Sequence, residues 1–313
     1  MTPSILISSA GAKVPLLDAA SNAASRIKCN PKVIAADSNP RAVSQYFSDE
    51  FWCMKPLSSY TDDELINELR AREICFVLPT RDGELPRWSS LRDRLLGEGI
   101  HVPVSDTATL AIAMDKLRFT TWLQENHFQH IETWTEPTSI TVDKIVVKER
   151  FANAPKNTLL NVNAKHAKDF SGGHQSPLFQ EFIEGLEISV DIWAHNSGET
   201  SCLARTRDLV VDGEARVTSY FSNPILESIA VSLSNRIGLR GPGVFQFILS
   251  ANGNFYPIEC NARVGGASTF SLNTKFDSLY LSLCEVFEEP PINVRIAQDF
   301  SRQVRAMKDY YFK

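Results

Sequence analysis

The sequence has 313 residues, of which 43% are hydrophobic and 22% are charged, and its net charge is −5. This composition is typical of a globular protein long enough for two or three subdomains. No stretch concentrates Lys and Arg, which argues against a nucleic-acid partner. No apolar run has the length of a membrane span, and the N-terminus lacks a signal-peptide pattern, so we expect a cytoplasmic protein with no membrane partner. The six cysteines form no C-x-x-C pair, which argues against a zinc site.

The first hundred residues alternate between strand and helix patterns. Short apolar runs at 4–8, 32–36 and 74–78 predict strands, and helical patterns follow the first of them and recur at 61–72 and 85–97. The helical pattern at 61–72 opens on a capping box, Thr61-Asp62-Asp63-Glu64. Such alternation predicts a doubly wound parallel sheet of the α/β class, whose ligands bind at the carboxyl ends of the strands. Ser9-Ala10-Gly11, after the first strand, is either a phosphate loop or an ordinary turn.

The middle of the chain carries two lysines at the ends of predicted elements. A helical pattern at 107–114 leads into Asp115-Lys116, and the strand pattern Ile145-Val146-Val147 ends at Lys148. An Asp-Lys step is ordinarily a surface ion pair, and a lysine at a strand end is ordinarily exposed. The segment 149–157 that follows contains no glycine.

Residues 178–191 predict an amphipathic hairpin whose outer face is acidic, with Glu181 and Glu187 among its polar positions. Farther on, Arg205 and Arg207 fall on one face of a predicted strand. They are either two arginines at an exposed sheet edge or contacts for an anion. A helical pattern at 225–237 then ends at Gly238, which we expect to be its C-cap.

The stretch 241–268 predicts a hairpin with oxygen ligands on one face. The turn chemistry at 251–254 pairs two strands and brings Gln246 near Glu259, and Asn261 lies two residues on, on the same strand face as Glu259. One carboxylate and two amide oxygens suit Mg²⁺ that keeps water and phosphate ligands. Arg263 and the glycines after it offer a cation and a close backbone approach to an anion. Cys260 is expected on the opposite face as a small buried side chain. Taken singly, each residue is ordinary in a hairpin.

Three separate segments together resemble one family. Glu259-Cys260-Asn261-Ala262-Arg263-Val264-Gly265-Gly266, with the upstream Val-Phe-Gln-Phe strand, resembles the E-x-N-x-R-x-G-G signature of the ATP-grasp superfamily, in the branch of the carbamoyl phosphate synthetase large subunit. The run 178–191 resembles its adenine-binding segment, and Lys116 and Lys148 match its two phosphate-binding lysines. The resemblance implies an ATP-grasp fold of mixed α/β and α+β class. Its expected parts are a preATP-grasp domain at 1–106, a linker helix with a small lid at 107–178, and a C-terminal subdomain at 179–313.

The resemblance also implies roles for residues. Those expected to bind the nucleotide are Lys116, Lys148, Glu181, Phe182, Ile183, Glu187 and Asn261, with Glu181 to Ile183 on adenine and Glu187 on ribose. Those expected to hold Mg²⁺, or Mn²⁺, are Gln246, Glu259 and Asn261. The catalytic set is Arg263, Lys148 and Arg207, the last facing the carboxylate of an acid substrate. Asp82 and Glu84 are either acceptor contacts or solvated loop acids.

The implied activity is that of a stand-alone ligase. ATP would activate a small-molecule carboxylate as an acylphosphate, an amine would attack it, and ADP and phosphate would be released. The chain departs from the family in lacking the glycine-rich loop after Lys148, which normally closes over the phosphates. The alternative is therefore a nucleotide-binding regulatory or assembly protein with weak or no turnover. The resemblance leaves a homodimer open, and it does not identify the acid or the amine.

Overall fold

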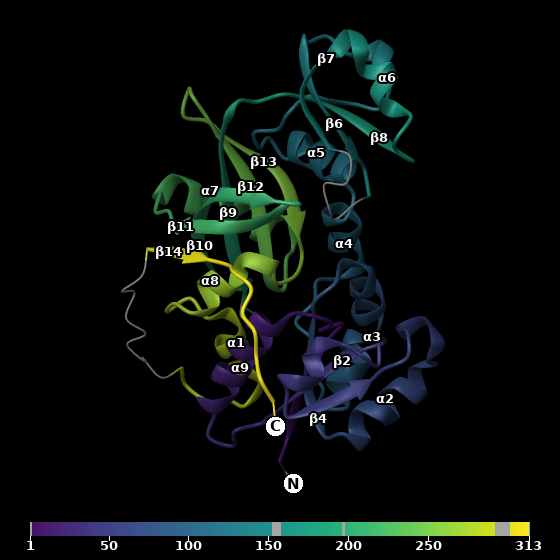
Figure 1. Cartoon of the computed structure of the whole chain (residues 1–313), viewed down its shortest axis with the longest axis vertical. Helices are drawn as coiled ribbons and strands as arrows, with labels where there is room; N and C mark the ends of the chain where they lie inside the picture. The colour runs from purple at the N-terminus through teal and green to yellow at the C-terminus, as the bar shows by residue number, and fades with distance from the viewer. Residues whose placement is uncertain (1, 152–157, 196–197, 292–300, 313) are drawn as a thin grey trace.

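The computed structural model describes residues 2–151, 158–195, 198–291 and 301–312 (Figure 1). Its α-helices are α1 (Val14–Ser25), α2 (Asp62–Ala71), α3 (Leu85–Gly97), α4 (Thr107–Ala113), α5 (Lys116–Glu125), α6 (Ala167–Ser171), α7 (Pro224–Ile237), α8 (Thr269–Leu272) and α9 (Ser278–Val286). Its strands are β1 (Ser4–Ser8), β2 (Lys32–Asp37), β3 (Glu50–Cys53), β4 (Ile74–Pro79), β5 (Thr133–Trp134), β6 (Lys144–Glu149), β7 (Leu159–Asn163), β8 (Pro177–Glu181), β9 (Gly185–Ala194), β10 (Thr200–Val211), β11 (Glu214–Tyr220), β12 (Gly241–Ser250), β13 (Phe255–Asn261) and β14 (Arg302–Val304).

The N-terminal sheet confirms the predicted parallel, doubly wound arrangement. Its order is β3-β2-β1-β4, and each neighbouring pair is parallel. Every residue of β1 is buried, because Ile5 and Ile7 pack with the α1 side of the sheet while Leu6 packs with the α2 and α3 side. The capping box at Thr61 is present. Strand β3 was not predicted, since four residues are too few to show a pattern.

The large sheet has the order β13-β12-β9-β10-β11-β14, and all its pairs are antiparallel. One face is apolar and packs on α5 and α7, where Phe119 of α5 stacks on Phe245. Cys260 lies on this face and is 3% exposed, which confirms the predicted filler. The opposite face carries the polar side chains of Ser189, Asp191 and Gln246, so polar groups gather on the side away from this core.

A third sheet, of order β5-β8-β6-β7, lies with α6 at the far end of the molecule from the N-terminal sheet (Figure 1). It is reached through α4 and α5, which run along one side. Strand β8 straddles the expected boundary at 178 and belongs to this sheet. Helix α7 ends at Gly238 with φ +82°, so the predicted C-cap is confirmed.

Beyond Ser268 the sequence pattern predicts one helix through Tyr280 to Phe287 and a short tail, and the structure differs from this prediction. Two helices form, α8 and α9, because the Asp277 carboxylate accepts a hydrogen bond from the Tyr280 N–H (3.0 Å) and starts a new helix. Arg26, the C-cap residue of α1, pairs with the same carboxylate. The tail is also structured: β14 pairs with β11, and the rings of Tyr310 and Phe312 contact Phe47 of the N-terminal domain. Figure 1 shows this tail running from β14 down to the N-terminal domain. No helix in the described residues has the length and apolar character needed to cross a bilayer.

Replacing Gly185 with alanine is expected to lower the free energy of unfolding by about 3 kcal/mol. A Cβ there would lie 2.3 Å from the Leu249 carbonyl oxygen, so the β9–β12 pairing would have to open. Gly97→Ala is the matched control, since a Cβ at Gly97 has no neighbour within 4 Å. Urea unfolding followed by tryptophan fluorescence measures both. Equal unfolding midpoints for the two variants would contradict the close approach of these strands.

Candidate functional site

The hairpin β12–β13 places its polar residues in register. Gln246 is directly opposite Glu259, and Val244 is opposite Asn261, so the predicted pairing of Gln246 with Glu259 is confirmed. Asn261 follows Glu259 by two residues and therefore points to the same face of the sheet. The same row continues into β9, where Gln246 is opposite Ser189. One carboxylate and two amide groups thus line one polar edge of the large sheet.

Two lysines from outside the large sheet come to this edge. Lys116 is the first residue of α5, and its Nζ lies 3.7 Å from Glu259 Oε1. Lys148, near the end of β6, donates a hydrogen bond from Nζ to Gln180 Oε1 at 2.7 Å. The structure therefore brings together Lys116, Lys148 and Glu259, which lie on three different elements.

The charge balance of this cluster favours an anion. Burial, and after it the charge of Lys116, lowers the pKa of Lys148 to about 8, although the Glu259 carboxylate opposes both effects. Two cations close enough to repel each other share one carboxylate. A phosphate group placed between them would relieve this repulsion.

Asp115 does not form the ordinary surface pair with Lys116. Its carboxylate caps α5 and takes two hydrogen bonds from Arg150, at 2.7 Å from Nε and 2.6 Å from Nη2. The Arg150 carbonyl oxygen in turn accepts the Lys116 N–H at 3.4 Å. This bidentate contact ties the end of β6 to the start of α5, and so it fixes the two lysines relative to each other. The glycine-free segment beyond Phe151 lies, at 152–157, outside the described residues.

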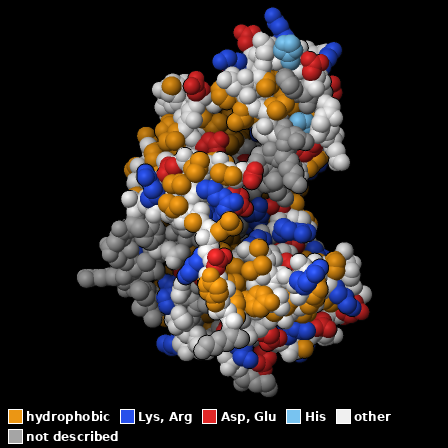
Figure 2. All heavy atoms as spheres, in the orientation of Figure 1, with side chains coloured by type: hydrophobic (Ala, Val, Ile, Leu, Met, Phe, Trp, Pro, Cys, Tyr) orange, Lys and Arg blue, Asp and Glu red, His pale blue; other side chains and the backbone are white. Residues whose placement is uncertain are grey.

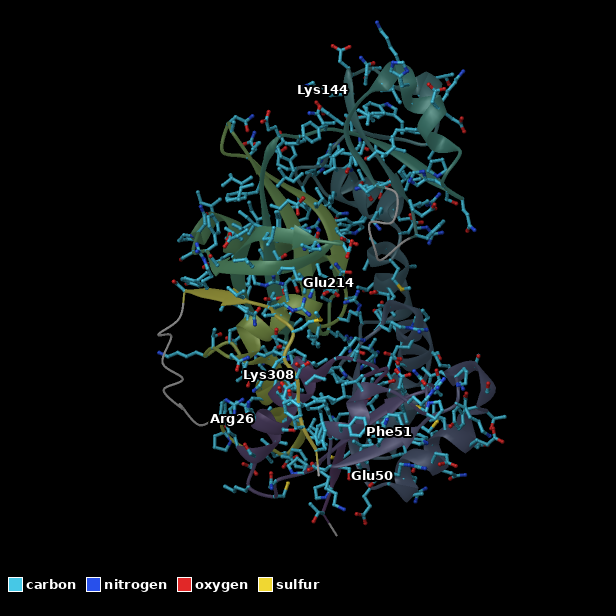
Figure 3. The ribbon with its side chains drawn as sticks, viewed as in Figure 1. Arg26, Glu50, Phe51, Lys144, Glu214 and Lys308 are labelled. Atoms are coloured by element: carbon cyan, nitrogen blue, oxygen red, sulfur yellow. The ribbon has the colours of Figure 1, made fainter. Side chains whose placement is uncertain are left out.

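The predicted adenine segment joins β8 to β9. The Glu181 N–H bonds to the Glu132 carbonyl, and the Phe182 N–H bonds to the carbonyl of Lys144, both at 3.0 Å; Lys144 is labelled in Figure 3. Within the described chain, no backbone hydrogen bond engages Ile183. Ile183 is therefore the residue of this segment whose N–H can serve a ligand, whereas the Phe182 N–H is already used.

Glu187 and Arg207, predicted for ribose and for the acid substrate, are brought together. Arg207 Nε donates to Glu187 Oε2 at 2.9 Å, and its Nη2 donates to the Gly213 carbonyl oxygen at 3.0 Å. The exposed-edge alternative for the arginines is wrong, because β10 lies inside the sheet and Arg205 is 2% exposed. Arg205 pairs with the buried Asp191. The anion contact predicted at Arg207 would therefore lie beside the ribose contact.

Asp82 and Arg263 connect the N-terminal domain to the end of the hairpin. Arg263 Nε donates to Asp82 Oδ2 at 2.7 Å, and Nη2 bonds to the same oxygen. Glu84 takes hydrogen bonds from the Thr80 N–H (2.8 Å) and Trp88 Nε1 (3.1 Å). Both acids are 4% exposed, so the solvated-loop alternative is wrong. Glu84 holds its own loop, and only Asp82 touches the predicted catalytic arginine.

The Ser9-Ala10-Gly11 turn is held by a side chain that the sequence reading did not single out. Lys13 Nζ donates to the Ser9 carbonyl oxygen (3.0 Å) and to Thr80 Oγ1 (2.6 Å), and so it joins the ends of β1 and β4. Burial lowers the pKa of Lys13 to about 8. A Cβ on Gly11, whose φ is +42°, would approach Asp37 Oδ2 to 3.2 Å. The turn thus carries structural contacts and faces a carboxylate, which favours an ordinary turn over a phosphate loop.

A metal at this site would depend on few charges. Among the described residues, no group of three or more His, Cys, Asp or Glu side chains is arranged to hold a metal ion. Glu259 is the carboxylate at the hairpin edge, with Gln246 and Asn261 as neutral oxygen donors. Such a donor set fits Mg²⁺ that takes its other ligands from phosphates and water.

Sequence reasoning missed Gln180, Arg150 and Lys13, which position the site. Gln180 is 5% exposed and orients Lys148, and its place in the motif run 178–191 was the only signal for it. Arg150 stood at the start of the glycine-free segment and was interpreted as a departure from a pattern. No local signal marked Lys13, whose partner Thr80 is 67 residues away.

Two family models match parts of the sequence. The model described as "ATP-grasp in the biosynthetic pathway with Ter operon" matches residues 174–309, and that described as "PylC-like, N-terminal domain" matches residues 5–103. Together they include the hairpin, the adenine segment and the parallel sheet. No curated protein matches the sequence.

Solved structures share the fold at low identity. The biotin carboxylase domain of 2-oxoglutarate carboxylase from Hydrogenobacter thermophilus, in complex with MgADP and bicarbonate, aligns with TM-score 0.70 and 14% identity over 94% of this chain and 71% of that one. N5-carboxyaminoimidazole synthetase from Staphylococcus aureus, complexed with ADP, aligns with TM-score 0.69 and 15% identity over 96% of this chain and 80% of that one. The L-amino acid ligase from Bacillus licheniformis aligns with TM-score 0.68 and 15% identity over 92% of this chain and 75% of that one.

Proposed function

Because the chain belongs to the ATP-grasp superfamily, we propose that it is an ATP-dependent, ADP-forming ligase that joins a small-molecule carboxylate to an amine. The observation that carries this proposal is the meeting of Lys116, Lys148 and Glu259 at the polar edge of the large sheet. Lysines from two elements and a carboxylate beside two amides form a place for a polyphosphate with its cation.

The nucleotide is proposed to lie between the third sheet, of order β5-β8-β6-β7, and the large sheet. The Ile183 N–H would donate to the adenine edge, and the Glu187 carboxylate would accept from the ribose hydroxyls. Lys116 and Lys148 would hold phosphate oxygens. Gln246, Glu259 and Asn261 would hold Mg²⁺, which when bound neutralises phosphate charge.

In the proposed reaction, a carboxylate oxygen of the acid attacks the γ-phosphorus, and the bond to the β-phosphate oxygen breaks, giving an acylphosphate and ADP. The amine nitrogen then attacks the acyl carbon, phosphate leaves, and the amine loses a proton. Arg263 is the proposed cation beside the transferred phosphoryl group, and Asp82 fixes the plane of its guanidinium. Arg207 is the proposed contact for the acid's carboxylate. Catalysis on this account is positioning and charge stabilisation.

The affinity for Mg·ATP is expected to fall as the pH rises through about 8, because Lys148 loses its proton there in the free protein. Bound phosphate raises the pKa of Lys148 again, so binding above this pH takes up a proton and weakens by up to about ten-fold per pH unit. Below pH 8, Lys148 is already charged in the free protein, so it adds no pH dependence to the affinity for Mg·ATP. Calorimetry at pH 7, 8 and 9 in two buffers measures this uptake. Lys148→Arg, which stays charged, should remove the slope, whereas the same proton uptake in both proteins would contradict the role of Lys148.

Turnover is tested by incubating the protein with Mg·ATP, pooled carboxylic acids and pooled amines, and by measuring ADP and phosphate. Release of both that requires an acid and an amine supports the ligase. Lys148→Met should abolish it, and Lys165→Met, on the exposed surface of the lid, is the matched control. Mg·ATP binding without turnover in any pool would overturn the ligase in favour of a nucleotide-binding regulatory protein.

A further inference from the structure

A cavity of about 460 Å³ lies away from the predicted nucleotide and metal residues. Its walls come from α1, from β11, from α8 with the residue after it, and from β14 with the tail. The chain segments that meet there are far apart in sequence, and Figure 1 shows α1, α8 and the tail side by side. Its volume lies within the range of small-molecule sites. None of the residues predicted to bind nucleotide or metal lines it.

One end of the cavity carries excess positive charge. Arg305 Nη1 pairs with Glu214 Oε2 at 3.0 Å, so its charge is balanced. Arg216 also lines the cavity, and within the described residues its guanidinium has neither an ion pair nor a hydrogen bond. Only its backbone is engaged, the carbonyl accepting the Arg305 N–H at 2.8 Å. A half-buried guanidinium without a counterion is suited to a ligand carboxylate. On the face of the molecule that Figure 2 shows, Lys and Arg side chains gather near the middle. Figure 3, in the same orientation, labels Glu214 in this region.

Two other groups of the cavity can accept hydrogen bonds, Gln303 Oε1 and the Asp18 carboxylate. The Gln303 amide is oriented by its Nε2 donating to Thr269 Oγ1 at 3.1 Å, while its Oε1 is buried and has no partner in the described structure. A buried acceptor without a donor is costly, so it favours a ligand that supplies one. Asp18 of α1 adds a carboxylate to the same lining. The cavity is therefore bipolar, with a free guanidinium and two acceptors.

Arg305, which lines the cavity, also lies beside the turn that follows the β12–β13 hairpin. A Cβ built on Gly266 would lie 3.7 Å from Arg305 Nη1 and 3.7 Å from Glu214 Oε1. Gly266 closes the E-x-N-x-R-x-G-G run that begins at Glu259. A ligand contacting Arg305 would thus lie one side chain away from this turn.

We propose that this cavity binds a small zwitterion of the amino-acid class, with its carboxylate on Arg216 and Arg305 and its ammonium group on Asp18 and Gln303 Oε1. The site is separate from the acid contact proposed at Arg207, and its occupancy requires no nucleotide. The cavity has room for an amino acid or a dipeptide.

The probes are the twenty common amino acids, tested singly by thermal shift, with each ligand found then measured by calorimetry. At least one is expected to bind wild type. Arg216→Ala should weaken it at least about ten-fold, because a charged hydrogen bond is lost. Arg302→Ala, on the neighbouring strand β14 but outside the cavity, should bind like wild type.

The role of Asp18 is tested with two ligands: the amino acid found to bind, and the deaminated acid, which is the same molecule without its amino group. Asp18→Asn should weaken the amino acid about ten-fold and leave the deaminated acid within about two-fold. No binding by any probe, or equal binding to wild type and Arg216→Ala, would overturn the proposal. Mg·ATP binding is measured in the same proteins and should be unchanged in Arg216→Ala, so failure of the nucleotide site would be seen separately.

Discussion

Replacing Glu259 with glutamine is expected to lower acid-dependent ADP release by about 100- to 1,000-fold at saturating ATP. Glu259 is the single carboxylate opposite Gln246 on the hairpin, and it is also the partner of Lys116. Glutamine keeps the shape but removes the charge that attracts a divalent cation. It also leaves Lys116 and Lys148 facing each other with less compensation, since the Glu259 carboxylate raises the pKa of Lys148.

The measurement is the Mg²⁺ dependence of ADP release in wild type, in Glu259→Gln and in Glu125→Gln. Glu125 is exposed at the end of α5 and serves as the matched control, with unchanged turnover expected. A Glu259→Gln protein that reaches wild-type turnover at raised Mg²⁺ would show a role in metal affinity alone. Wild-type turnover at every Mg²⁺ concentration would contradict the assignment of Glu259.

Replacing Asp191 with asparagine is expected to cost about 3–5 kcal/mol of stability, because it leaves a buried guanidinium without its carboxylate. Both side chains of the Asp191–Arg205 pair are 3% exposed, and Arg205 Nη1 already lacks a partner in the described residues. Asp191 Oδ1 also accepts from Ser268 Oγ at 2.5 Å, and Ser268 Oγ accepts from the Gly265 N–H at 3.0 Å. The substitution therefore loosens the turn beside the proposed phosphate site as well.

Urea unfolding checks this, and the double variant Asp191→Leu, Arg205→Met should recover most of the loss because no buried charge remains. Arg70→Ala, which breaks an exposed pair with Glu98, should change stability by less than about 1 kcal/mol. A loss as small for Asp191→Asn as for Arg70→Ala would mean that the pair is solvated in the folded protein.

The local parts of the site could be predicted from sequence because they depend on short-range geometry. Gln246 and Glu259 are joined by a turn of a few residues, so alternation along two strands fixed their pairing. The ends of α2 and α7 followed from a capping box and a glycine. The convergence of Lys116 and Lys148 was expected only through the family resemblance, since nothing local relates α5 to β6.

The long-range contacts could not be predicted, because residue type does not identify a partner far along the chain. Asp82 meets Arg263 across 181 residues, and an acid in a polar loop is ordinarily exposed. The split between α8 and α9 was missed because no Gly or Pro interrupts the pattern, and the signal was the single capping residue Asp277. The tail was missed because three residues of β14 pair with a distant strand.

The most direct test of the proposed chemistry is to run the ATP reaction with unlabelled pooled acids and amines in water enriched in oxygen-18. If the acid's oxygen attacks the γ-phosphorus, that oxygen stays with the phosphate after the amine displaces it. Mass spectrometry of the released phosphate should then show no solvent-derived oxygen. Phosphate that carries one solvent oxygen would mean that water attacks ATP directly, which would contradict carboxylate activation by this protein.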